Sequence, residues 1–280
     1  MEICRQQLIS STQSQPDWLQ AINWQAPWLA SVRQAAIEVL HFDDWREGLN
    51  QCIAKAGTQN LAGLPLHFIA QQDLPEGQAY EAHIAATGGV PTRDNLHDWF
   101  NALVWLSFPE IKRQLNALQA AQIAALGIGK QRGPARDAAT LFDENAALLA
   151  LPDTPLGTQL EQLLRQHQWQ ELFIQQRQHF DNSVALFAFG HALMEKLVQP
   201  YKAITAHCYV VKLPEAFFSL EKSQQQAQLD RLVAQRLTQQ GLLPSHFTPL
   251  PVAGVPGWWP AQDSGFYADA QVFRPPRQAR

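Results

Sequence analysis

The stretch TRDNLHDWFNAL, residues 92–103, concentrates side chains that bind metal ions, transfer protons or orient substrates. A helix that begins after a cap at Thr92 or Asp94 places four polar side chains on one face, at i, i+3, i+4 and i+7: Asp94, His97, Asp98 and Asn101. A solvent-facing side in this chain is expected to carry Gln and Lys, and this face contains neither. We interpret the face as one wall of a chemical site. The alternative is a solvated face with Asp94 as its N-cap.

A second candidate lies in the run VALFAFGHALMEKLV, which is apolar almost all round and predicts a buried helix over residues 183–199, ended by Pro200. His191 and Glu195 are four residues apart and share its inward stripe. A buried carboxylate is costly unless it is paired, protonated or bound to a metal. The pattern therefore predicts that Glu195 is a metal ligand or general base. The alternative is a hydrogen-bonded His–Glu pair in the core.

A third candidate is the stretch RGPARDAATLFDENAALLAL, which predicts a helix that begins at Pro134. Arg136 and Asp143 are seven residues apart and align on such a helix, as do Asp137 and Glu144. We expect Asp143 and Glu144 to point into the cavity that the other two segments line. The alternative is a surface patch of ion pairs, which contributes little to stability.

Together these segments supply imidazoles and carboxylates without thiolates, a donor set that suits iron, manganese or zinc with open coordination positions. The predicted metal ligands are His97, Asp98, Asp143, Glu144, His191, Glu195 and, as the weakest member, His207 in a strand-like segment. The HD pair at residues 97–98 is also similar to that of helical phosphohydrolases, where His67 or His83 would complete the set with Asp143. None of these three segments contains an ExxH motif, which disfavours a ferritin-like site.

This donor set predicts a metal-dependent hydrolase that acts on a small molecule. Asp98, Glu195 and Asn101 are the predicted catalytic side chains. Arg93 and Arg136, helped by Lys202, would stabilise a phosphate or carboxylate of the substrate.

The competing function class is a binding or scaffold protein without chemistry, in which the polar clusters form a buried hydrogen-bond network. Its aromatic C-terminal segment, anchored by Trp258 and Trp259, would contact a partner or simply pack on the body. Nucleic-acid binding is disfavoured, because the chain has a net charge of −4 and only a short basic end.

The elements that must position these residues are mostly helical, as capped periodic segments predict. Helices are expected at 45–57, from Thr92 or Asp94 to 106, at 109–127, from 134, at 155–180, 183–199 and 219–241. Short strands are expected at 66–70 and 80–84, and the best strand candidate is 203–213. The predicted fold class is mainly α with a minor strand component, in one domain with an irregular N-terminal third. Its parts are N-terminal helices (1–60), a motif-bearing body (61–241) and a C-terminal wrapping segment rich in proline and aromatic residues (242–280).

Composition places the protein in a reducing cytoplasm. The three cysteines form no CxxC motif, so neither a disulfide framework nor a cysteine zinc site is expected. The N-terminus lacks the pattern of a signal peptide, and the longest apolar run is too short to span a bilayer. No membrane partner is expected.

Four motifs resemble a bacterial family catalogued as domain of unknown function 3025: GVPTRDNLHDWFNALVWLSFP, RGPARDAATLFDENAALL, FGHALMEKLVQPYKAITAH and YADAQVFRPPR. The resemblance runs from about residue 60 to the end of the chain. It implies a cytoplasmic proteobacterial protein that acts as a single unit, and it implies no particular chemistry. The site residues named above follow from spacing and residue type alone.

Overall fold

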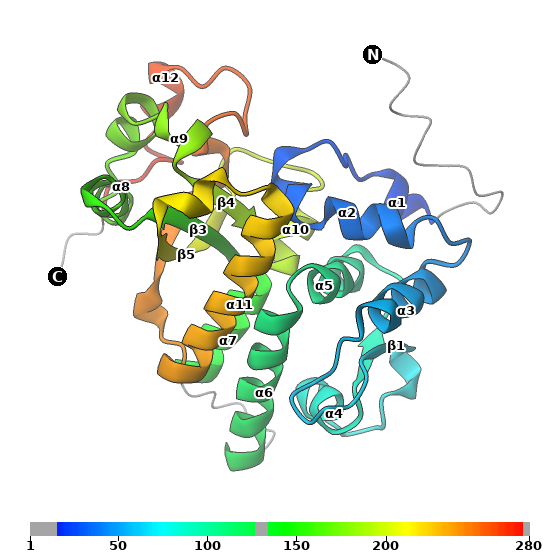
Figure 1. Cartoon of the computed structure of the whole chain (residues 1–280). Helices are drawn as coiled ribbons and strands as arrows, with labels where there is room; N and C mark the ends of the chain where they lie inside the picture. The colour runs from blue at the N-terminus through cyan, green and yellow to red at the C-terminus, as the bar shows by residue number, and fades with distance from the viewer. Residues whose placement is uncertain (1–15, 127–133, 277–280) are drawn as a thin grey trace.

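The computed structural model describes residues 16–126 and 134–276 (Figure 1). Helix accounts for 56% and strand for 14%, which confirms the expected excess of helix over strand. The strands nevertheless organise the molecule, because four of them form a sheet with helices on both faces.

This sheet has the order β4 (Ala185–Ala188), β3 (Ala146–Pro152), β5 (Thr205–Leu213), β6 (Phe247–Pro251). The two central strands are parallel, with Ala146 opposite His207, and both outer strands run antiparallel to their neighbours. Every residue of β3 is buried. A strand covered on both faces reads as a continuous apolar run rather than an alternating one.

Two hydrophobic clusters lie on opposite faces of this sheet. Leu148 and Tyr209 belong to the larger cluster, which α2 (Ala30–Val39), α5 (Leu96–Ser107), α6 (Pro109–Leu126), α7 (Pro134–Asn145) and α11 (Lys222–Gln240) complete. Leu149 and Cys208 belong to the other, which α8 (Pro155–Arg165), the π-helical turn η3 (Glu171–Gln175) and α12 (Ser264–Tyr267) cover. Figure 1 shows α8 and α12 gathered on one side, away from α6 and α7.

The N-terminal part packs beside α5 and α6. It comprises α1 (Asp17–Gln20), η1 (Pro27–Leu29), α2, α3 (Trp45–Ala56), β1 (His67–Ala70), η2 (Gln71–Asp73), α4 (Tyr80–Thr87) and β2 (Gly89–Thr92). Helix α3 has the ends that its sequence predicts: the Asp44 side chain accepts the N–H of Glu47, and Gly57 ends the helix at φ 64°. Strands β1 and β2 form a separate parallel pair.

Three predicted elements were wrong, and a fourth, the helix from Pro134, was confirmed at its start but is followed by a strand. The run 183–199 is not one helix: it contains strand β4, and α10 spans only His191–Lys196. The predicted helix from Pro134 ends at Asn145, and β3 begins at the next residue. The strand expected at 80–84 is instead the start of α4. Periodicity cannot separate a short buried strand from a buried helix, because both read as unbroken apolar runs. The long helix expected at 155–180 is divided among α8, η3 and α9 (His179–Asn182).

The C-terminal segment packs on the body, as expected. After the short turn η5 (Pro244–His246), β6 extends the sheet, and η6 (Val252–Gly254) and α12 follow. The Tyr267 hydroxyl donates to the carbonyl of Gly254, and the indole N–H of Trp169 donates to the carbonyl of Arg274.

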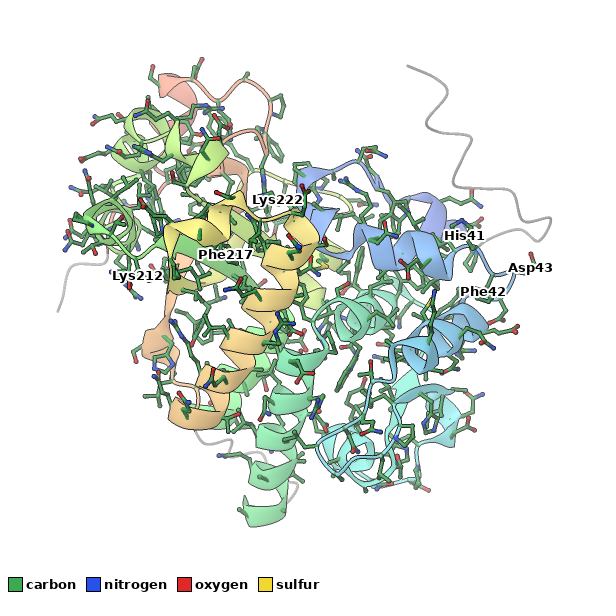
Figure 2. The ribbon with its side chains drawn as sticks, in the orientation of Figure 1. His41, Phe42, Asp43, Lys212, Phe217 and Lys222 are labelled. Carbon is green, nitrogen blue, oxygen red and sulfur yellow. The ribbon has the colours of Figure 1, made fainter. Side chains whose placement is uncertain are left out.

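Side chains of α11 alternate between core and surface. Phe217, in the preceding turn η4 (Glu215–Ser219), is buried, whereas Lys222 begins the helix at the surface (Figure 2). Among the described helices, none has both the length and the apolar character needed to cross a bilayer.

Candidate metal centre

A close approach between two chain turns assembles the site. One turn joins the end of α7 to β3, and the other joins β4 to α10 through Gly190. The backbone N–H groups of Phe189 and Gly190 both donate to the carbonyl of Ala146, at 3.0 and 2.8 Å. A Cβ atom at Gly190 would lie 2.5 Å from the carbonyl oxygen of Glu144, so a side chain here would force the turns apart. This contact places His191 beside Glu144.

Helix α5 brings the third side chain, His97. The helix begins at Leu96, because its N-cap is Asn95 rather than Thr92 or Asp94, and the side chain of Asn95 accepts the N–H of Asp98 at 2.8 Å. Helix α5 packs directly on α10. The Nε2 atoms of His97 and His191 consequently lie 3.1 Å apart, with the rings nearly perpendicular at 83°. His97, on the polar face of α5, therefore lies within side-chain reach of His191.

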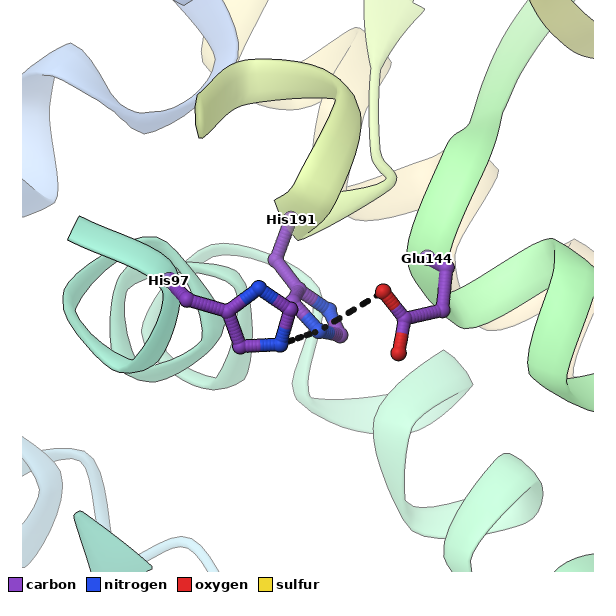
Figure 3. Close-up of side chains that lie close together, drawn as sticks. All are labelled: His97, Glu144 and His191. Carbon is purple, nitrogen blue, oxygen red and sulfur yellow. Dashed lines mark hydrogen bonds and ion pairs between the residues drawn. The ribbon is translucent and has the colours of Figure 1, made fainter. Parts of the chain in front are cut away.

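Glu144 completes a cluster of three possible ligands. Its Oε2 lies 3.6 Å from Nε2 of His191, and one ligand atom from each of His97, Glu144 and His191 falls within 4.8 Å of the others (Figure 3). Two nitrogens bound to one metal at about 2.1 Å with an angle of roughly 90–110° are separated by about 3.0–3.4 Å. The observed spacing of the two Nε2 atoms therefore fits two ligands of one ion.

Two further carboxylates face the outer nitrogens of these imidazoles. Oε2 of Glu195 lies 2.9 Å from Nδ1 of His97, and Oδ2 of Asp143 lies 3.9 Å from Nδ1 of His191. A carboxylate in hydrogen-bond contact, as Glu195 is, orients a metal-binding histidine and keeps the proton on the far nitrogen. Asp143 is too far from Nδ1 of His191 for a hydrogen bond, and this buried nitrogen has no hydrogen-bond partner among the described residues, so Asp143 acts on His191 through its charge. The Glu195 side chain is 40% exposed rather than buried as predicted, because α10 is a six-residue helix whose last turn reaches the surface.

A buried polar chain leads away from the cluster. Nζ of Lys112 donates to Oδ1 of Asp143 at 2.6 Å and to Oδ1 of Asn101 at 2.8 Å, and Nδ2 of Asn101 donates to the Tyr80 hydroxyl. Asn101 therefore contacts Lys112 rather than the three-residue cluster. Lys112 was not among the predicted site residues. A signal was present, since Lys112, Asn116 and Gln119 recur at helical spacing and form one buried polar stripe on α6.

Other predicted site residues have partners of their own. Asp98 is buried and accepts the backbone N–H, Nε and Nη2 of Arg93, whose side chain remains 56% exposed. Burial raises the pKa of Glu81, and the charge of Arg136 is one of the weaker influences that oppose this shift. His207 contacts the side chain of Asn145 at 2.9 Å, outside the cluster of three, and Lys202 pairs with Asp269 at 2.7 Å.

Burial controls the protonation of the cluster. It lowers the pKa of His191 to about 3, so the imidazole is neutral and able to bind a metal. Burial also raises the pKa of Glu144. For Asp143, burial alone would raise the pKa, but the charge and the hydrogen bond of Lys112 hold it below its usual value. An anionic Asp143 therefore stands behind His191.

A cleft of about 1050 Å³ lies elsewhere, between α2, α11 and the edge strand β4. Its polar lining groups join helices. Gln226 donates to the carbonyls of Ser31 and Ser107, and Asp230 accepts the N–H groups of Glu110 and Ile111 at the start of α6. None of the three cluster residues lines this cleft. Gln226 and Asp230 are thus engaged in joining helices. Among the described residues, His97, Glu144 and His191 remain the better candidates for metal binding and catalysis.

The model of a family described as "Protein of unknown function (DUF3025)" matches residues 66–277 of the chain, which confirms the resemblance drawn from its motifs. The matched region includes α5, α7 and α10, the three elements that supply the cluster. No curated protein and no solved structure matches the chain significantly. The description of the family assigns no activity, so the chemistry must follow from the side chains.

Proposed function

We propose that this chain, which belongs to the family of unknown function that its model matches, binds one divalent metal ion through His97, Glu144 and His191 and is a metal-dependent hydrolase of a small molecule. The observation that carries the proposal is the convergence of three ligand atoms from three separate helices. Each imidazole also has a carboxylate near its other nitrogen. Two histidines with one carboxylate are the protein ligands of several catalytic zinc and non-haem iron sites.

Three protein ligands leave coordination positions for water and substrate, as in catalytic rather than structural sites. A bound metal would supply an activated water and polarise the scissile group. The residues of this chain would do the rest. Glu195 would hold the proton on Nδ1 of His97, and Asp143 would orient His191. Arg93, whose side chain is 56% exposed and lies within electrostatic range of Glu195, would contact an anionic group of the substrate.

The proposal is tested by the metal content of the purified protein. We expect about one equivalent of zinc, manganese or iron, restored to metal-free protein by titration and detected by calorimetry. The His97→Ala, Glu144→Ala and His191→Ala variants should each lose it. The matched control is His41→Ala, since His41 is exposed in the connection between α2 and α3 (Figure 2). Retention of the metal by all three variants would refute this ligand set.

The second candidate function is a scaffold without catalysis. The buried Lys112–Asp143 pair and the Arg93–Asp98 pair favour it, because fully satisfied polar networks also specify how helices pack. It predicts a wild-type protein that takes up no divalent metal, together with variants that lose only stability. The same elemental analysis and titrations therefore decide between the two functions.

A further inference from the structure

Lys112 is buried where a lysine is costly. Its residue is only 4% exposed, in the first turns of α6, and its ammonium lies 5.2 Å from the centre of the Trp105 ring. Lysines are almost never fully buried without a partner. Removing Lys112 from water must therefore be offset by interactions that α6 could not obtain from a leucine at this position.

One of those interactions leads toward the cluster, and the other holds the ammonium from the opposite end of the polar chain. The ammonium donates to Oδ1 of Asp143 and to Oδ1 of Asn101, which is itself held by the Tyr80 hydroxyl. Two acceptors from two different helices fix the ammonium in space. With Oδ1 of Asp143 bound in this way, its other oxygen, Oδ2, is the one that faces Nδ1 of His191 at 3.9 Å.

We propose that Lys112 is a positioning residue of the metal centre: by anchoring one oxygen of Asp143, it holds the other toward His191, where its negative charge orients the ring that presents Nε2 to the metal. This inference rests on the proposed function and deepens it. Outer groups that orient a ligand typically change metal affinity by about 10–100-fold when they are removed. Lys112 acts one step further out, entirely through Asp143.

The test is a double-mutant cycle on the full chain. The dissociation constant of the metal-free protein for Zn²⁺ is measured by competition with a chromophoric chelator for four proteins: wild type, Lys112→Met, Asp143→Asn and the double variant. We expect each single variant to weaken binding by about 10–100-fold and the double variant to be no weaker than the worse single variant. The visible spectrum of the Co²⁺-loaded protein should also change in Lys112→Met, because the ring of His191 is no longer held.

The matched control is Arg113→Met on the same turn of α6. Arg113 pairs with Glu110 and stands outside the buried chain, so this change removes a cation from the helix without touching Asp143. It should leave Zn²⁺ affinity and the Co²⁺ spectrum unchanged. A merely structural Lys112 would lower the melting temperature of the metal-free protein and leave both metal readouts as in wild type, which would overturn the inference.

The outcomes separate this inference from the proposed function. A wild type that binds no metal overturns the proposed function. If the wild type and Lys112→Met bind Zn²⁺ equally tightly, only the role of Lys112 is overturned. The same holds if the losses of affinity in the two single variants add up in the double variant. If Lys112→Met does not fold, Asn101→Ala replaces it, since Asn101 is the second group that fixes the ammonium. Unchanged Zn²⁺ affinity in that variant would count against the inference in the same way.

Discussion

Replacing Glu195 by Gln separates an orienting residue from a structural one. The carboxylate accepts the Nδ1 proton of His97 at 2.9 Å, and Gln keeps the size of the side chain while it deletes the charge. The side chains of His97 and Glu195 are 32% and 40% exposed. A pair this accessible contributes at most about 1 kcal/mol to stability, because water screens it. We therefore expect the metal-free variant to unfold within about 1 kcal/mol of wild type.

Metal binding should respond much more strongly. Loss of a carboxylate behind a histidine ligand weakens binding by about 10–100-fold. That range corresponds to roughly 1.4–2.7 kcal/mol of binding free energy. The assays are chelator competition with Zn²⁺ for the affinity and chemical denaturation of metal-free protein for the stability. Both must use metal-free protein as the reference, since a bound ion itself stabilises the fold.

The control variant is Glu161→Gln, which removes a surface carboxylate paired with Arg165 at 2.9 Å. It should change neither quantity by a measurable amount. The reasoning is refuted if Glu195→Gln loses several kcal/mol of stability in the metal-free state while its Zn²⁺ affinity equals that of wild type. Glu195 would then hold two helices together and have no part in a metal centre.

Three further predictions concern the surroundings of the cluster. Gly190→Ala should cost at least about 1–3 kcal/mol of stability and weaken Zn²⁺ binding, because the new methyl meets the backbone of Glu144; a stable, metal-binding variant would contradict this. Asp98→Asn should lower stability by roughly 1–3 kcal/mol, since it removes the charge and replaces one of the two oxygens that accept from Arg93 by an NH2 donor, yet leave metal stoichiometry unchanged; loss of the ion would instead make Asp98 a ligand. Burial raises the pKa of Asp230 to about 7, so the folded protein binds an extra proton there. The stability that this proton contributes is present below a pH of about 4 and is lost as the pH rises towards 7. Denaturation of Asp230→Asn should therefore show a shallower fall in stability over this range than wild type, and equal slopes would contradict the shift.

The local sequence determines where several elements begin and end. Asp44 and Gly57 mark the ends of α3, and Pro109 marks the start of α6, as their residue types predict. Strand β5 was recognised from its β-branched and aromatic residues. These signals are local because a cap, a left-handed glycine or a fixed proline φ depends only on the backbone within one turn. The family, too, could be recognised from the motifs.

The identity of β3 and β4 depended on the tertiary structure. Both are apolar runs that the sequence analysis assigned to helices, and both are strands because a neighbouring strand and two layers of helices cover them. Burial on both faces erases the alternation that normally marks a strand.

The candidate site shows the same division. Residue type and spacing nominated His97, Glu144 and His191 among seven metal ligands, and they also nominated Asp98 and His207, which the fold directs to other partners. Which side chains meet depends on the packing of α5 on α10 and on the contact at Gly190. These are contacts between residues about fifty to a hundred positions apart, and one sequence holds no local signal for such distances. For that reason the chemical types of the site were readable from the chain, while the choice among them was made by packing.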